Sequence, residues 1–292
     1  MLSQEKFTLL IPAVVLLLFI IVIPLLYSLV MSLFDWNLQT GYPPRFVGIG
    51  NLIEAFFKDD RFLSSIWRTI IIGVPVITAQ VIIGMILALQ LSKIEKFRAF
   101  FTSILIIPVM VSPMISGMAW RMVFVPRYGI LNYILRLLHI IGDKEIDWLG
   151  TPKLALIAVI IVEIWRMMPF VMMILLAGLQ SINPELYEAS AIDGASGWQQ
   201  YFLIILPLLS APLMVAILIR IIDVFSLFGT IYTLTQGGPG GATETVSYYI
   251  YQQGFKFMRI GYASLLSYVV VCVVMVLVIL SLRANKNQIV EA

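Results

Sequence analysis

The chain has 292 residues, of which 61% are hydrophobic and only 12% are charged, whereas a soluble domain of average composition carries about 25% charged residues. The net charge of +3 is small and the basic residues are scattered, which argues against a nucleic-acid partner. A single cysteine, Cys272, excludes a disulfide framework and a thiol-based metal site. This composition is typical of a protein embedded in a bilayer.

Six stretches are long enough to cross the hydrocarbon core of a membrane, which takes about 20 apolar residues in a helix. Four of them lack charged residues, whereas the fourth and fifth contain ionisable side chains. We predict an all-α membrane protein with one membrane domain, residues 1–292, and both termini on the same side. The predicted spans are residues 9–33, 69–91, 100–120, 154–179, 202–228 and 262–282.

The basic residues favour one orientation of these spans, although raw numbers point the other way. Lys93, Lys96 and Arg98 form a dense cluster in one tight connection, while the longer loops of the opposite side hold more basic residues in total. Short loops carry most weight in the positive-inside rule. We therefore predict that this connection and both termini are cytoplasmic.

Two further features concern the helices. After the first span, residues 52–67 have the apolar spacing of one short helix on the membrane surface. In the third span, Pro108 and Pro113 predict a kink or break, because proline lacks a backbone donor and clashes with the preceding turn.

The loop between the fourth and fifth spans predicts a short helix that projects from the membrane. Asn183 is a suitable N-cap, and Pro184 suits the first helical position. Residues 186–192 then form two helical turns, and Gly194 is a suitable stop.

The same loop carries the run Glu188-Ala189-Ser190, then Asp193-Gly194-Ala195, followed by Leu206-Pro207. This pattern resembles the EAA loop of binding-protein-dependent ABC import permeases, with Ser190 where alanine is commoner. The resemblance implies the six-span, MetI-like core of a type I ABC importer and a cytoplasmic coupling loop, residues 182–201. It also implies that a partner ATPase is contacted by Glu188, Ala189, Ser190, Asp193 and Gly194.

Other motifs are similar to the carbohydrate-importing, MalF/UgpA-like branch of these permeases. They are Phe46-Val47-Gly48, Gly178-Leu179-Gln180 and Leu-Thr-Gln-Gly-Gly-Pro-Gly at residues 234–240. The resemblance implies a permease in a bacterial or archaeal cell membrane that imports a sugar or oligosaccharide. Its implied partners are a second homologous permease in a heterodimer, two cytoplasmic ATP-binding subunits and an extracellular solute-binding protein.

We expect no catalytic residue, metal or cofactor in this chain, so that ATP and Mg would be used by the partner ATPase. The glycine-rich residues 237–241 are followed by Ala242-Thr243, whereas a phosphate-binding P-loop needs a lysine and a hydroxyl residue there. His139 is the only histidine, which leaves no zinc motif. An ion-coupled secondary transporter is the rival transport function, but the sequence shows no internal inverted repeat.

Ionisable residues inside the fourth and fifth spans predict polar faces that point into the bundle. Glu163 and Arg166 lie three residues apart, as do Arg220 and Asp223. Because a charge at the centre of a span costs about 2.5–3.5 kcal/mol, we expect each acid to pair with its neighbouring arginine.

By resemblance, these faces line the sugar site. Arg220 and Asp223 depart from the maltose pattern, which has uncharged residues there. The alternative substrates are therefore a polyol, glycerol phosphate or a uronate-containing oligosaccharide, provided that the acids do not already neutralise the arginines. The predicted substrate-binding residues are Arg166, Met167, Phe170, Arg220, Asp223, Val224 and Leu227.

Overall fold

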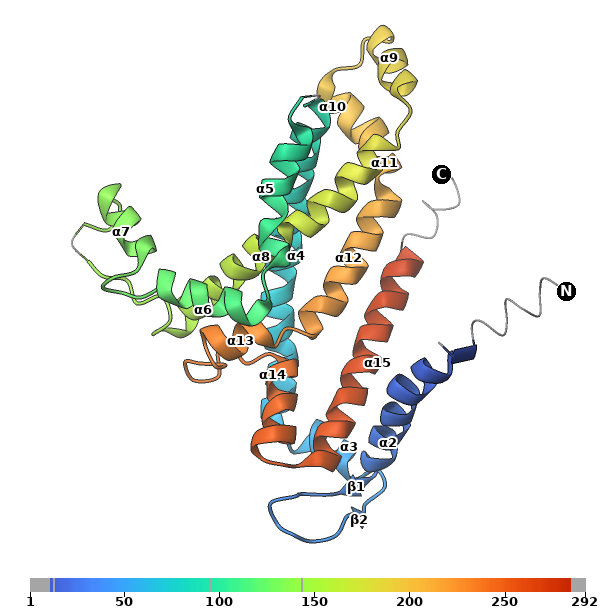
Figure 1. The fold of residues 1–292 in the computed structure, drawn as a ribbon, viewed down its shortest axis with the longest axis vertical. Helices are drawn as coiled ribbons and strands as arrows, with labels where there is room; N and C mark the ends of the chain where they lie inside the picture. Colours follow the sequence, from blue (N-terminus) through green and yellow to red (C-terminus); the bar gives the residue numbers. More distant parts are fainter. Residues whose placement is uncertain (1–10, 13, 95, 143, 285–292) are drawn as a thin grey trace, which may run out of the picture. The chain divides into compact units, whose positions relative to one another are not determined.

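The computed structural model describes residues 11–12, 14–94, 96–142 and 144–284. The chain divides into two compact units, one of Met1–Ser64 with Tyr249–Val273 and the other of Ser65–Tyr248 with Val274–Ala292. Helices dominate the part of the chain that the structure describes (Figure 1). Helix α4 (Asp60–Lys93) and helix α15 (Ile260–Ala284) each contribute residues to both units.

The first unit contains a two-stranded antiparallel sheet, in which Phe34 pairs with Phe46 and Asp35 with Arg45. Its elements are η1 (Leu18–Val22, a π-helix), α2 (Ile23–Met31), β1 (Phe34–Asp35), β2 (Arg45–Phe46), α3 (Gly50–Phe57), the start of α4, the end of α14 (Val246–Tyr251), η3 (Gln252–Lys256, a π-helix) and most of α15.

The single surface helix predicted at residues 52–67 is wrong, because the chain breaks between α3 and α4. Asp59 caps α4: its Oδ1 accepts a hydrogen bond from the backbone N–H of Phe62 at 2.9 Å. Its Oδ2 accepts from the hydroxyl groups of Tyr249 and Tyr262, both at 2.6 Å. The carboxylate thus starts a new helix where apolar spacing alone predicts a continuous one.

The second unit is built around α8 (Pro152–Gln180), which takes part in two hydrophobic clusters. The C-terminal half of α8 packs with α4 and the start of the fifth predicted span, and its N-terminal half packs with α4 and α13 (Gly229–Leu234). The other elements are α5 (Arg98–Met110), α6 (Pro113–Val123), α7 (Ile130–Leu137), α9 (Pro184–Ile192), α10 (Gly197–Gln200), η2 (Tyr201–Ile205, a π-helix), α11 (Leu206–Leu208) and α12 (Ser210–Phe225).

Among the described residues, four helices are long and apolar enough to cross a membrane, or up to six if each of two bent pairs is one span. Helices α5 and α6 meet at 95°, which confirms the break predicted from Pro108 and Pro113, whereas a 64° bend before Ser210 was not expected. The four long helices are Val14–Met31, Asp60–Lys93, Pro152–Gln180 and Ile260–Arg283. Residues 9, 10 and 13 of the first predicted span lie outside the described residues.

Candidate functional sites

A buried polar network in the second unit is centred on Glu163 of α8, whose side chain is 2% exposed. Its carboxylate accepts hydrogen bonds from Arg166 Nη2 at 2.8 Å and Nε at 3.3 Å. It also accepts from Thr230 Oγ1 of α13 at 2.6 Å, and Arg220 Nη2 lies 4.0 Å away. Glu163 therefore joins its own helix to α13 and approaches α12.

Arg220 of α12 is held from two further directions. Its Nε donates to Gln80 Oε1 of α4 at 2.9 Å, and its Nη1 donates to Asp223 Oδ2 at 2.7 Å. Gln80 in turn donates through Nε2 to the backbone carbonyl of Glu163 at 2.7 Å. The predicted pairs of Glu163 with Arg166 and Arg220 with Asp223 are confirmed.

Two carboxylates balance two guanidinium groups in this network, which satisfies the requirement that buried charges be paired and hydrogen-bonded. Sequence reasoning missed Gln80 and Thr230. They are neutral residues 83 and 67 positions away from Glu163 along the chain, so no helical spacing links them to it.

The seven predicted substrate-binding residues differ in their accessibility. The side chains of Arg166 and Asp223 are 12% and 38% exposed, and Phe170 is partly buried. Val224 packs closely on α4, because a Cβ added to Gly73 would lie 2.5 Å from Val224 Cγ1. The residues buried within the chain are Met167, Arg220, Val224 and Leu227.

The projecting helix α9 is capped at both ends by its own sequence. The side chain of Asn183 accepts a hydrogen bond from Glu185 N, and Pro184 occupies the first helical position, as predicted. At the other end Gly194 has a φ of +79°. The backbone N–H groups of Gly194 and Ala195 donate to the carbonyls of residues 191 and 190 at 3.1 and 3.0 Å, which completes a Schellman motif.

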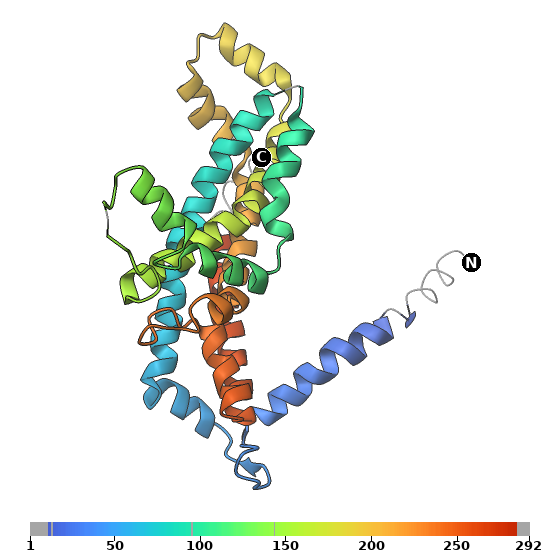
Figure 2. The ribbon, with the colours of Figure 1, turned by 60° about the vertical axis from the view of Figure 1, so that its left-hand side comes forward.

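Most side chains of α9 are exposed, including those of Glu188 and Ala189, and Ile192 is 86% exposed. Ser190 is buried. Its hydroxyl donates to the Tyr187 carbonyl at 2.8 Å and accepts from Nε2 of Gln200, the last residue of α10, at 3.0 Å. Both views show α9 and α10 beyond the C-terminal end of α8 (Figures 1 and 2). The helix is thus capped at both ends and largely exposed, and it contacts the rest of the unit through buried Ser190 and partly buried Tyr187.

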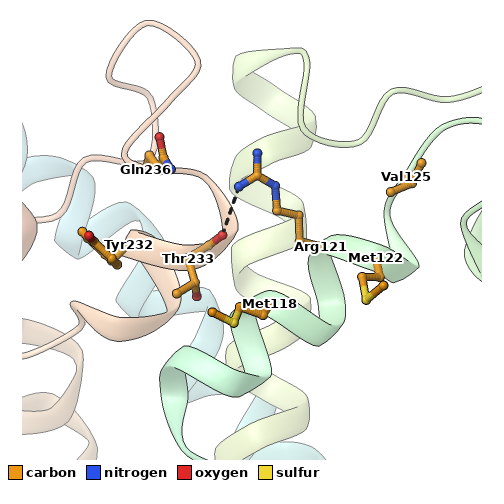
Figure 3. A pocket seen from close by; sticks show the side chains of 7 residues that line it. All are labelled: Met118, Arg121, Met122, Val125, Tyr232, Thr233 and Gln236. Carbon is orange, nitrogen blue, oxygen red and sulfur yellow. Dashed lines mark hydrogen bonds between the residues drawn. The ribbon is translucent and has the colours of Figure 1, made fainter.

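A separate cavity of about 520 Å³ lies at the C-terminal ends of α6 and α13 (Figure 3). Helices α6 and α13 approach closely beside it, since a Cβ added to Gly117 would lie 2.0 Å from Thr233 Oγ1. Arg121 Nη1 donates to the Thr233 carbonyl at 3.5 Å. The lining residues are Met118, Arg121, Met122, Val125, Tyr232, Thr233 and Gln236.

The described residues form four long apolar helices, two further apolar helix pairs that bend at a break, and a charge-balanced buried network. These features define a multi-pass helical membrane protein. Residues 80–288 match the family described as "Binding-protein-dependent transport system inner membrane component". The chain belongs to this family of ABC transporter permeases. The predicted family, the six-span MetI-like fold and the multi-pass membrane location are thereby confirmed.

Named relatives include the trehalose/maltose transport system permease protein MalF of Thermococcus litoralis, 39% identical over 69% of this chain and 67% of that protein. The sulfoquinovosyl glycerol transport system permease protein SmoG of Agrobacterium fabrum is 34% identical over 96% of this chain and 90% of that protein. A bacterial alginate ABC transporter, crystallised with a periplasmic protein that binds an alginate pentasaccharide, has a chain with the same fold. Its TM-score is 0.82 at 21% identity, over 98% of this chain and 95% of that chain.

Proposed function

We propose that this chain forms half of the membrane pathway of an ATP-driven importer for a sugar or oligosaccharide. The other half would be a second homologous permease in a heterodimer, and an extracellular binding protein would deliver the substrate. Two relatives whose names state a sugar-containing substrate support the saccharide class, with trehalose/maltose and sulfoquinovosyl glycerol. The UgpA protein of Agrobacterium fabrum, named for sn-glycerol-3-phosphate, supports the glycerol phosphate alternative instead. The fold shared with an alginate transporter agrees with the saccharide class.

The observation that carries the proposal is the exposed helix α9. A helix capped at both ends keeps its shape without a tertiary partner, and this one leaves most side chains free to contact another protein. We assign Glu188, Ala189, Asp193 and Gly194 to the contact with one of two ATP-binding subunits, and Ser190 to the attachment of α9. The partner hydrolyses ATP with Mg, and this chain supplies no catalytic residue, metal or cofactor.

The position of the basic cluster supports a cytoplasmic location for α9 and hence for both termini. Lys93 and Arg98 line the same cavity, of about 1180 Å³, as Tyr187 of α9 and Trp198 of α10. Burial raises the pKa of Tyr187 beside this cavity. The short basic connection and the coupling loop therefore share one end of the second unit, and basic connections favour the cytoplasmic side.

The substrate pathway passes the exposed side of the polar network. Arg166, Phe170 and Asp223 offer a guanidinium, an aromatic face and a carboxylate, which are groups that saccharide sites use. Met167, Arg220, Val224 and Leu227 form the wall behind them. Because the network is neutral as a whole, its arginines give no preference for an anion. A polyol, glycerol phosphate or uronate-containing substrate is the alternative.

The coupling role is tested by co-purifying the chain with its ATPase subunits and measuring ATP-dependent uptake. Gly194→Asp introduces a charge at a left-handed position, where an added Cβ would meet no heavy atom within 4 Å other than those of the adjoining residues. We therefore expect the fold to persist and ATPase co-purification to fall sharply. Gly41→Asp is the matched control, because Gly41 also has a positive φ, +68°, and open surroundings. Equal ATPase recovery and equal uptake in the two variants would refute the coupling role of this loop.

A further inference from the structure

The cavity between α6 and α13 contains a cation that the polar network does not neutralise (Figure 3). Within the described ranges, no carboxylate lies within 4 Å of the Arg121 guanidinium, and its one hydrogen bond, to the Thr233 carbonyl, is long at 3.5 Å. Arg166 and Arg220, by contrast, each contact a carboxylate at 2.8 or 2.7 Å. Arg121 thus keeps most of its donors for a ligand.

The remaining lining complements such a cation. Met118, Met122 and Val125 form an apolar wall, and Tyr232 adds an aromatic ring. The backbone N–H of Gln236 donates to the Ile231 carbonyl. Its side-chain amide has no hydrogen bond to another described residue and provides both a donor and an acceptor. A concave apolar wall with a few polar groups, at a volume of about 520 Å³, is typical of a small-molecule site.

The cavity is connected to the network through α13. Thr233 lines the cavity and Thr230 contacts Glu163 at 2.6 Å, so the two lie one helical turn apart on neighbouring positions of the helix surface. Both lie toward the N-terminal half of α8, whereas α9 follows its C-terminal end. In the proposed orientation, a substrate that arrives from outside reaches Arg121 before it reaches Arg166 and Asp223.

We propose that this cavity binds the oxyanion group of a charged saccharide: a carboxylate, a sulfonate or a phosphate. This inference rests on the proposed function and adds the substrate class to it. The planar guanidinium of Arg121 binds the oxyanion through paired, charge-assisted hydrogen bonds. Gln236 binds hydroxyl groups of the sugar, and the exposed side chains of Met118 and Met122 provide apolar contacts to the sugar ring. The arginines of the network already pair with carboxylates, so we place charge selection at Arg121.

The test uses the assembled transporter, with its ATPase subunits and binding protein, in proteoliposomes. Uptake is measured for three matched probe pairs: trigalacturonate and its trimethyl ester, 6-sulfoglucose and glucose, and sn-glycerol 3-phosphate and glycerol. Wild type is compared with Arg121→Gln, Arg121→Lys and Arg127→Gln. Arg127 is the control, because it is an exposed arginine just beyond α6 that does not line the cavity.

We expect wild type to take up at least one charged probe. Arg121→Gln should raise the concentration for half-maximal uptake of that probe about tenfold or more, because the paired, charge-assisted hydrogen bonds to the oxyanion are lost. For Arg121→Lys this concentration should lie between those of wild type and Arg121→Gln, because lysine keeps the charge and loses the paired geometry. Uptake of neutral probes and the behaviour of Arg127→Gln should change less than twofold.

Several results would overturn the inference. The first is that wild type takes up only neutral probes, or no probe at all. The second is that Arg121→Gln and Arg127→Gln change the uptake of charged probes equally. An Arg121→Gln effect that vanishes in liposomes without anionic phospholipid would assign the cavity to a lipid headgroup instead. In each of these cases normal ATPase co-purification and coupling leave the proposed function standing, whereas loss of ATPase binding in wild type contradicts the proposed function itself.

Discussion

Removal of the Glu163 charge should destabilise the second unit more than any surface charge change. Glu163→Gln keeps the side-chain shape and an acceptor for Thr230, but it leaves Arg166 and Arg220 with only Asp223 to balance them. Breaking a buried ion pair by removal of one partner costs about 3–5 kcal/mol. For a unit of roughly 200 residues, at about 2–4 °C per kcal/mol, the thermal midpoint should fall by about 6–20 °C.

A double substitution separates charge balance from simple loss of contacts. Glu163→Gln combined with Arg166→Gln leaves Arg220 and Asp223 as a neutral pair at 2.7 Å. We expect the double variant to be more stable than the sum of the two single effects predicts, by about 0.5–3 kcal/mol, the range of coupling between contacting residues.

The assay is thermal unfolding of the purified transporter in detergent, followed by the loss of monodisperse protein. Glu54→Gln is the control, because Glu54 pairs with Arg259 at 2.6 Å with both side chains about one third exposed, and exposed pairs contribute about 0–1 kcal/mol. A midpoint for Glu163→Gln equal to that of Glu54→Gln would refute the reasoning. So would additive effects in the double variant.

Three further predictions concern packing, the attachment of α9 and pH. Gly117→Ala places a methyl group against Thr233 Oγ1 and should lower stability by about 1–3 kcal/mol, with partial recovery on adding Thr233→Ala, as read by thermal unfolding. Ser190→Ala removes the hydroxyl that accepts from Gln200, so hydrogen exchange in α10 should accelerate while the global midpoint stays constant. Burial, followed by the hydrogen bond to a carboxylate, raises the pKa of Tyr249. The contribution of Tyr249 to the free energy of unfolding is therefore fully present below the ordinary tyrosine pKa of about 10 and is lost as pH rises above that value. The stability of Tyr249→Phe should fall less steeply over the same pH range.

The features that could be predicted from the sequence are those that neighbouring residues determine. Asn183, Pro184 and Gly194 specify both ends of α9 within twelve residues, and the structure forms each cap as expected. Pro108 and Pro113 likewise specify the break between α5 and α6. The i, i+3 spacing of the acids and arginines predicts two ion pairs that the structure contains.

The features that could not be predicted depend on partners far away in the chain. Asp59 ends a helical pattern because it binds Tyr249 and Tyr262, which follow it by 190 and 203 positions. The cavity at Arg121 arises only when α13 packs on α6 near Gly117. At the end of an apolar span, Arg121 alone is indistinguishable from an ordinary interfacial arginine.

The hydrogen bonds of Glu163 also determine how a displacement of α9 would spread. They join α8 to α4 and α13, and Arg220 adds α12, so we expect these four helices to move as one rigid group. A displacement of α9 should move α8 directly, because α8 is one continuous helix from Pro152 to Gln180. The connection from α9 to α12 runs through η2 and α11 and contains the 64° bend before Ser210, where we expect a hinge. Angular motion should therefore concentrate at this hinge, while α4, α8, α12 and α13 keep their positions relative to one another.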